Sequence, residues 1–236
     1  MKIRALIISA ALAAGAAVAA DAPPPMLVRG VIAGIDAKSV TVTKTDGTSV
    51  TGAIAPMTFF AAVEPRRFDQ IKATDFVGIT SSPGPNGTLV AEEIHILPIH
   101  VGEGSYPWDH HPGGGATRAG SMTNGTVASA GPAKAGSMTN GTVTTSGAMT
   151  LTVTYHGAQV VDGKCVGHAP AGGASPCIGV ANVTVSPTTP IVAIVPAKPA
   201  DAKAGLTVFA NMANGPDGKT VVGSLVLEKN GIKPPM

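Results

Sequence analysis

The sequence predicts an all-β fold made of two small barrels. Short runs rich in Val, Thr and Ile recur between turn signals, and 30 glycines and 20 prolines interrupt the chain too often for long helices. The chain also contains an internal repeat, because residues 54–96 align with residues 185–227 at a constant offset of 131 without a gap. Together these observations indicate a tandem duplication of one β-structured unit.

The first repeat, residues 27–98, has the element order of a small OB-like barrel. Its expected elements are strands at 27–35 and 39–44, a third at 49–54 that continues extended through 58–63, a short helical turn at 65–73, and a hairpin of strands 75–80 and 88–96. The dipeptide Asp46-Gly47 supplies a tight turn between the second and third strands. Three strands, a short helix and two more strands predict a five-stranded OB-like barrel. Two small β-sandwiches are the alternative.

The second repeat, residues 141–236, is longer than the first. Upstream of the aligned region the offset falls to 111, with Gly141 matching Gly30, so about 20 extra residues lie at about 160–180. This insertion contains Cys165 and Cys177, the only cysteines in the chain. We expect them to form a disulfide, which would contribute on the order of 3 kcal/mol by closing a short loop. A metal or redox site using a thiolate and His168 is the alternative, although it lacks CxxC spacing.

Residues 99–140 form an aromatic joint and a Gly-rich linker between the repeats. Their second half begins a duplication with a period of 16, since AGSMTNGTV occurs at both 119–127 and 135–143. We expect the later copy to begin the second barrel, because it contains the glycine that matches Gly30. The earlier copy is then a surplus copy in a flexible or edge-paired linker.

The amino terminus predicts export from the cytoplasm. Lys2 and Arg4 precede an apolar run at 5–20, which is the order of a secretory signal with cleavage near Ala19 or Ala20. Without that leader, residues 1–20, the chain has 14 basic and 14 acidic side chains. This balance argues against nonspecific nucleic-acid binding and against binding to an anionic membrane surface. We therefore expect a periplasmic or secreted protein with no membrane span in its mature form.

Several segments resemble one family of bacterial proteins. The segments are VRGVIAGIDAKSVTVTKTDGTSVTGAI, FDQIKATDFVGI and PNGTLVAEEIHILP in the first repeat, with GEGSYPWD, GSMTNGTV and GIKPPM beyond it. They are similar to exported DUF5666-like β-barrel domains of unknown function, and in particular to a two-copy group from proteobacteria. The resemblance implies the fold and the compartment but no reaction. The cysteine-containing insertion and the pair His110-His111 depart from the pattern of that group.

Histidines near the joint form a candidate metal site. The set consists of His95, His100, Asp109, His110 and His111. Imidazole nitrogens with a carboxylate suit zinc or copper(II), although no recognised ligand spacing is present. The alternative is that His95 is a solvent-facing strand residue, opposite Ile94 and Ile96, and that the others are exposed loop residues.

Aromatic residues form a candidate contact patch. Tyr106 and Trp108 flank a proline in the joint, where they would either cap the open end of a barrel or form a platform for a sugar, peptide or partner surface. Phe59 and Phe60 are adjacent in an expected strand and cannot both face the core. One exposed phenylalanine beside Trp108 would complete the patch.

The motif content argues against an enzyme. The sequence contains no GxSxG elbow, HExxH helix, Walker loop or dinucleotide fingerprint. We therefore predict a non-catalytic module that binds or assembles with an envelope protein or wall component. The alternative is a periplasmic protein that binds copper or zinc, and hydrolysis of a wall polymer ranks third.

Overall fold

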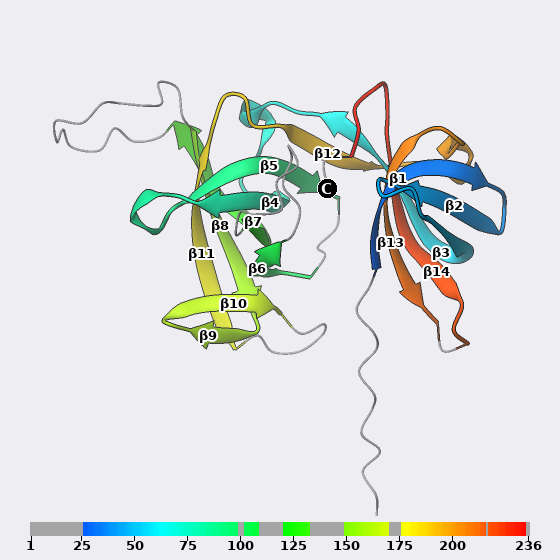
Figure 1. Ribbon diagram of the computed structural model, residues 1–236. Coiled ribbons are helices and arrows are strands. Elements are labelled where there is room, and N and C mark those ends of the chain that lie inside the picture. Colours follow the sequence, from blue (N-terminus) through cyan, green and yellow to red (C-terminus); the bar gives the residue numbers. More distant parts are fainter. Residues whose placement is uncertain are drawn as a thin grey trace, which may run out of the picture.

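The computed structural model describes residues 26–98, 102–108, 120–132, 149–169, 176–215 and 217–234. As predicted, the fold is all-β (Figure 1). The strands are β1 (Met26–Ile35), β2 (Ser39–Lys44), β3 (Ser49–Pro65), β4 (Phe76–Pro83), β5 (Leu89–Leu97), β6 (Gly104–Trp108), β7 (Gly120–Pro132), β8 (Met149–Gly157), β9 (Gln159–Val161), β10 (Lys164–His168), β11 (Cys177–Val185), β12 (Ile191–Pro196), β13 (Thr207–Asn214) and β14 (Thr220–Leu227). Short 3-10 turns η1 (Phe68–Gln70), η2 (Pro85–Gly87) and η3 (Pro199–Asp201) connect some of them. Within the described residues, no helix is long and apolar enough to cross a membrane.

Five strands close a first barrel, which we call barrel A. Their order is β1–β2–β3–β14–β13 and back to β1, with β3 and β14 parallel and every other pair antiparallel. In Figure 1 the blue and cyan strands of barrel A stand beside its orange and red ones. Its interior is filled by alternate side chains of all five strands, including Ile32, Val42, Phe60, Met212 and Leu225.

Five further strands close barrel B by the same scheme. Their order is β7–β8–β11–β5–β4 and back to β7, with β11 and β5 parallel. Side chains such as Ile79, Ile94, Leu151, Val153 and Val183 fill its interior. The structure thus contains two closed five-stranded barrels rather than two sandwiches.

Each barrel combines strands from both sequence repeats. Barrel A takes β1 to β3 from the first repeat and β13 and β14 from the second, whereas barrel B takes β4 and β5 from the first and β8 and β11 from the second. The repeats at 27–98 and 141–236 therefore do not each close a barrel of their own, and that expectation is corrected. The physical reason is that β13 and β14 of the second repeat are equivalent to β4 and β5 of the first. Either pair of strands can therefore close a barrel with the same hydrogen-bonded pairings.

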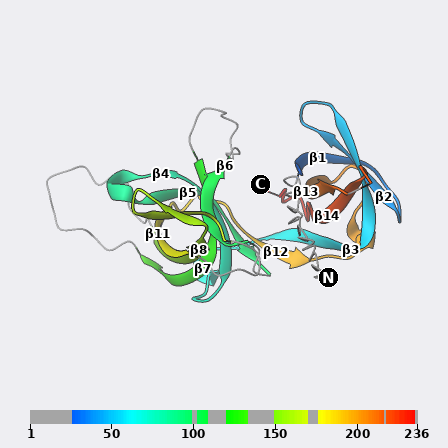
Figure 2. The same cartoon turned by 90° about the horizontal axis from the view of Figure 1, so that it is seen from below.

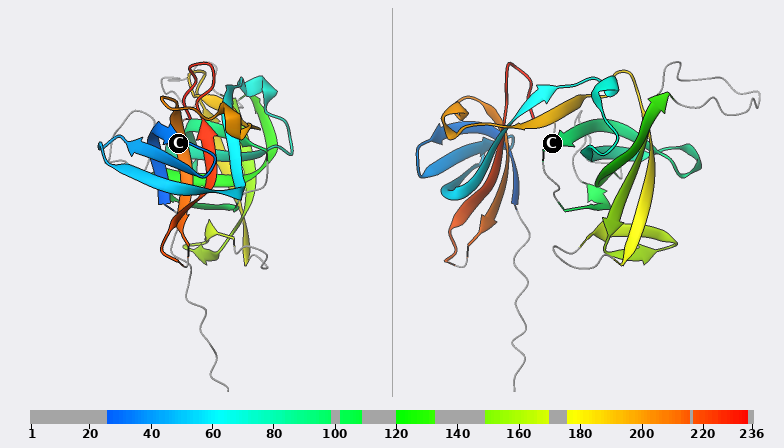
Figure 3. Two further views of the ribbon diagram at one scale, coloured as in Figure 1. Left: turned by 90° about the vertical axis from the view of Figure 1, so that its right-hand side faces the viewer. Right: turned by 180° about the vertical axis from the view of Figure 1, so that it is seen from behind.

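The exchange takes place where β3 and β12 cross between the barrels. The two strands run side by side between the barrels (Figures 2 and 3). They pair antiparallel, with Val63 opposite Ile194. Val63 and Ile194 are separated by the repeat offset of 131, so this pair marks a local pseudo-twofold axis. A third apolar cluster, which includes Val63, Val192, Ile194, Phe209 and Val226, forms at this crossing.

Strand β7 comes from the earlier copy of the 16-residue duplication. Gly125 of β7 lies opposite Val77, as Gly30 of β1 lies opposite the equivalent Val208. The prediction that the earlier copy is surplus was therefore wrong, and the reason is that nine identical residues at 119–127 and 135–143 give the sequence no means to choose. Most of the later copy lies outside the described residues.

The insertion of the second repeat forms a hairpin beside barrel B. Strand β9 pairs with β10, and β10 pairs with β6 of the joint. The predicted disulfide between Cys165 and Cys177 is confirmed. The Tyr155 hydroxyl donates a hydrogen bond to the Cys165 carbonyl at 2.8 Å, so the hairpin is also tied to β8 of the barrel.

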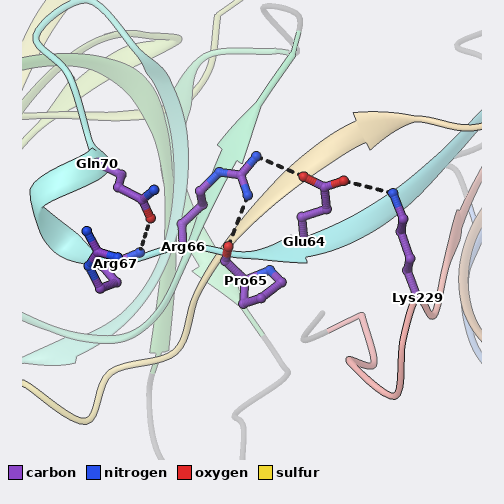
Figure 4. A network of polar contacts seen from close by, with 6 residues as sticks. All are labelled: Glu64, Pro65, Arg66, Arg67, Gln70 and Lys229. Carbon is purple, nitrogen blue, oxygen red and sulfur yellow. Dashed lines mark hydrogen bonds and ion pairs between the residues drawn. The ribbon is translucent and has the colours of Figure 1, made fainter.

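A polar cluster lies on β3 near the crossing (Figure 4). The Glu64 carboxylate accepts from Arg66 Nη2 at 3.0 Å and from Lys229 Nζ at 2.8 Å. These two cations, Lys229 first, hold the pKa of Glu64 below its ordinary value. Glu64 thus connects the first repeat to the segment that follows β14.

Candidate functional site

A cavity of about 530 Å³ lies between the two barrels. Its lining comes from β1, β3, β13 and β14 of barrel A and from β4, β5 and β7 of barrel B, together with β6, β10 and β12. Ile194 of the pseudo-twofold pair is part of this lining. The cavity therefore exists because the strand exchange holds the outer faces of the barrels against each other.

Four aromatic side chains line the cavity. They are Phe59, Tyr106, Trp108 and Phe209. The Tyr106 ring meets the Trp108 ring edge-on at a centroid distance of 6.1 Å. The Arg29 guanidinium lies 5.6 Å from the Trp108 ring and 5.3 Å from the Phe209 ring, so cation–π attraction helps to fix both rings.

Tyr106 also belongs to a polar network. Its hydroxyl accepts a hydrogen bond from Asn124 Nδ2 at 3.0 Å, and the same amide nitrogen donates to the Gly102 carbonyl at 3.2 Å. The ring lies against His168, with the centroids 3.7 Å apart. Burial raises the pKa of Tyr106 to about 12. Burial lowers the pKa of His168, which favours its neutral form.

Glu93 and His95 form a buried carboxylate–imidazole pair beside the cavity. Glu93 and His95 are 0% and 1% exposed, and His95 Nε2 lies 2.9 Å from Glu93 Oε1. The contact does not have the geometry of a hydrogen bond, so the pair is a close polar contact in which His95 Nε2 has no hydrogen-bond partner among the described residues. Thr80 Oγ1 lies 3.5 Å from the same carboxylate oxygen.

The position of His95 corrects one sequence-based alternative. Ile94 does face the core of barrel B and His95 the opposite face, as the alternation predicts. His95 is nevertheless 1% exposed and lines the cavity between the barrels, so it is not a solvent-facing residue. The sequence of one repeat contains no sign of a neighbour that covers its outer face.

Equivalent positions in the two repeats differ around the cavity. At the offset of 131, Glu93 corresponds to Ser224 and His95 to Val226. Gly78 corresponds in the same way to Phe209. All of these except Glu93 line the cavity. A symmetric backbone thus carries an asymmetric site, with the carboxylate–imidazole pair on the barrel B side only.

The predicted site residues are placed as follows. Of the candidate metal set, His95 lies at the cavity, while His100, Asp109, His110 and His111 lie outside the described residues. No group of three His, Cys, Asp or Glu side chains suited to a metal occurs in the described part of the chain. Copper or zinc binding therefore stays a prediction.

The candidate contact patch is divided between two environments. Phe59, Tyr106 and Trp108 line the cavity, whereas Phe60 is 6% exposed and belongs to the core of barrel A. Phe59, Tyr106 and Trp108 thus face the cavity between the barrels rather than an outer surface.

Sequence reasoning missed several residues of the site. Asn124, Phe209 and Ser224 line the cavity, and none of them stands out in sequence. Asn124 lies in the duplicated segment for which the sequence predicts a linker. The sequence suggests a role for His168 only beside the cysteines. The repeat alignment contained one usable signal, because positions equivalent to Glu93 and His95 carry different side chains.

Comparisons with known proteins add no relative. No family model matches the sequence, no curated protein is significantly similar to it, and no solved structure significantly matches its fold. The resemblance to exported DUF5666-like domains therefore stays a prediction, and the cavity itself is the basis for an interpretation of function.

Proposed function

We propose that the protein is a non-catalytic, exported binding module, and that the cavity between its barrels binds a small, mostly apolar molecule. The observation that carries this proposal is the cavity of about 530 Å³ with four aromatic side chains in its wall. Sites for small molecules are typically concave, apolar and of roughly 300–1,000 Å³, with a few fixed polar groups. The disulfide supports an oxidising compartment.

The lining favours a neutral ligand. Among its described residues there is no Asp, Glu, Lys or Arg, and the members with polar groups are His95, Tyr106, Trp108, Asn124, His168, Asn211 and Ser224. A charged ligand would lose its hydration in this cavity, whose described lining residues carry no formal charge, and the nearby Arg29 guanidinium already lies over the Trp108 and Phe209 rings. A neutral molecule with apolar faces loses little on entry.

Binding of a neutral fluorescent probe tests the proposal. N-Phenyl-1-naphthylamine becomes fluorescent in apolar surroundings, and Trp108 at the cavity can transfer energy to it. We expect saturable binding with one probe per chain. The charged analogue 8-anilinonaphthalene-1-sulfonate should bind at least tenfold more weakly, because burial of its sulfonate costs hydration that the uncharged lining residues do not replace.

A cavity-filling variant shows whether the probe occupies this site. A Cβ at Gly223, which lines the cavity, meets only the Asn211 carbonyl oxygen, at 3.5 Å, so Gly223→Phe adds bulk without a backbone clash. The matched control is Gly34→Phe on β1, where a Cβ meets nothing within 4 Å and the site does not line the cavity. We expect Gly223→Phe to abolish probe binding and the control to retain it. Equal binding by both variants would contradict the proposal.

A further inference from the structure

We propose that Tyr106 is the polar anchor of the cavity, and that its hydroxyl donates a hydrogen bond to the carbonyl oxygen of a neutral aromatic ketone or ester. This inference rests on the proposed function, since it names the chemical class of the ligand that the cavity would bind. It is supported by the hydrogen bonds of the two tyrosines and by the residues that line the described part of the cavity.

The hydrogen-bond geometry fixes which way the Tyr106 hydroxyl is used. The Gly102 carbonyl can only accept, so the atom of Asn124 that lies 3.2 Å from it must be the amide nitrogen. The same nitrogen lies 3.0 Å from the Tyr106 oxygen, which therefore acts as an acceptor. The hydroxyl proton of Tyr106 remains, and within the described residues no protein acceptor takes it.

The second tyrosine provides an internal comparison. The Tyr155 side chain is buried, and its hydroxyl donates to the Cys165 carbonyl at 2.8 Å. Tyr155 and Tyr106 are the only tyrosines in the chain. Tyr106 is partly buried and lines the cavity, so its hydroxyl proton can be donated to a molecule in that space. In barrel B the hairpin satisfies one tyrosine, whereas a bound ligand would satisfy the other.

Tyr106 is held as a donor before a ligand arrives. Its pKa of about 12 keeps the proton on the oxygen at neutral pH. Contacts with the His168 ring at 3.7 Å and the Trp108 ring at 6.1 Å restrict the phenol ring, so little freedom is lost on binding. A rigid donor at one side of an apolar cavity is a means of orienting a ligand.

The ligand class follows from these properties. The described wall carries no charged Asp, Glu, Lys or Arg side chain, which favours a neutral molecule, and its aromatic rings favour a flat one. The Tyr106 hydroxyl and the Trp108 indole N–H, which also has no partner among the described residues, are both donors, so the ligand needs an oxygen that accepts. A carbonyl oxygen only accepts, whereas an alcohol would bring a further donor that needs its own partner.

A pair of matched probes tests the inference. Acetophenone and α-methylstyrene are both planar and nearly isosteric, and they differ in the replacement of C=O by C=CH₂. Their affinities are measured by displacement of N-phenyl-1-naphthylamine from the wild-type protein and from Tyr106→Phe. We expect Tyr106→Phe to weaken acetophenone binding by roughly three- to tenfold and to leave α-methylstyrene within about twofold, because the variant removes only one neutral hydrogen bond.

Tyr155→Phe is the matched control, because it removes the hydroxyl whose proton is already used within the protein. We expect it to change neither probe's affinity. Equal effects of Tyr106→Phe on both probes, or no effect on either, would overturn the inference while the binding module stands. Failure of the fluorescent probe itself to bind would overturn the proposed function as well.

A second measurement does not depend on any variant. The carbonyl stretch of ¹³C-labelled acetophenone bound to the wild-type protein should appear at a lower frequency than in hexane, because a hydrogen bond weakens the C=O bond. A bound band at the hexane frequency would contradict donation by Tyr106.

Discussion

Barrels A and B share one plan of strand pairing, but only barrel B carries additional structure. Both close through five strands with one parallel pair, and both place a glycine at the same point of the first strand, Gly30 in A and Gly125 in B. Barrel B also contains the disulfide-linked hairpin, strand β6 and the buried Glu93–His95 pair. The difference indicates that positions required for closure stayed alike in both repeats, while positions facing the cavity diverged.

The strand exchange makes this divergence useful for binding. Since β3 and β12 cross at the Val63–Ile194 pair, the outer face of each barrel becomes one wall of a shared cavity. Side chains at equivalent positions then face a common space from opposite sides. A change in one repeat alters one wall only, so a symmetric framework can give a ligand a defined orientation.

The largest effect is expected when the shared closure glycine is replaced. A Cβ at Gly30 would lie 2.1 Å from the Thr43 carbonyl oxygen, which belongs to the backbone of the paired strand and cannot rotate away. Gly30→Ala should therefore lower the free energy of unfolding by roughly 3 kcal/mol or more. Chemical denaturation followed by circular dichroism measures the loss.

Gly34→Ala on the same strand is the control for this prediction. A Cβ at Gly34 meets nothing within 4 Å, so this variant should stay within about 0.5 kcal/mol of the wild type. Similar losses in both variants would show that strand propensity, rather than the close approach to Thr43, determines the requirement for glycine.

The second prediction concerns the disulfide that only barrel B has. Replacement of Cys165 and Cys177 by alanine opens a loop with a sequence separation of 12 and should cost roughly 3 kcal/mol. Because barrel B contains β4 and β5 of the first repeat, we expect one cooperative transition at a lower denaturant concentration. Two separate transitions would show that the barrels unfold independently despite the exchange.

Much of the fold can be predicted from local patterns. The Val/Thr alternation and the turn residues give the strands, and the offset of 131 relates the last strands of the two repeats. The exchange cannot be predicted in this way, because β4 and its equivalent β13 offer similar edges to either first strand. In the structure β3 continues through Val63 into its pairing with β12, and the strands that follow it, β4 and β5, join barrel B.

The candidate site shows the same limit of sequence reasoning. Alternation correctly places Ile94 and His95 on opposite faces of β5, yet it contains no information about what covers the outer face. Trp108 and Tyr106 are conspicuous because aromatic residues are few. Asn124, which orients Tyr106, lies in a segment whose two copies are identical, so the sequence could not assign it to a strand.

The third prediction uses this duplication to distinguish the two barrels. A Cβ at Gly125 would lie 2.3 Å from the Thr154 carbonyl oxygen, a clash like that at Gly30. Barrel B, unlike A, has a second segment of identical sequence at 135–143 that can replace the damaged strand by a shift of 16 residues. The shift uses all 16 residues between Pro132 and Met149, so the last pairs of the replacement strand with β8 must give way to a turn. Gly125→Ala should therefore cost about 1 to 2 kcal/mol, still less than a clash that no second segment relieves.

The double variant Gly125→Ala/Gly141→Ala tests this explanation, because it removes the glycine from both copies. It should cost roughly 3 kcal/mol or more, as Gly30→Ala does. If Gly125→Ala alone were as damaging as the double variant, the later copy would be unable to replace β7.

The smallest effect is expected at Glu64, whose equivalent in the second repeat is Val195. Its carboxylate is partly exposed, so loss of its contacts with Lys229 and Arg66 in Glu64→Gln should lower the melting temperature by at most about 2 °C at pH 7.

The folded-state pKa of Glu64 lies below its ordinary value of 4.5. Its stabilising effect is therefore present above pH 4.5 and is lost as the pH falls through the lower folded-state value. Melting curves of the two proteins should converge on acidification and separate again on return to pH 7. A difference that persists after the carboxylate is protonated would show that Glu64 acts through packing at the crossing, which would make it part of the joint between the barrels rather than a surface ion pair.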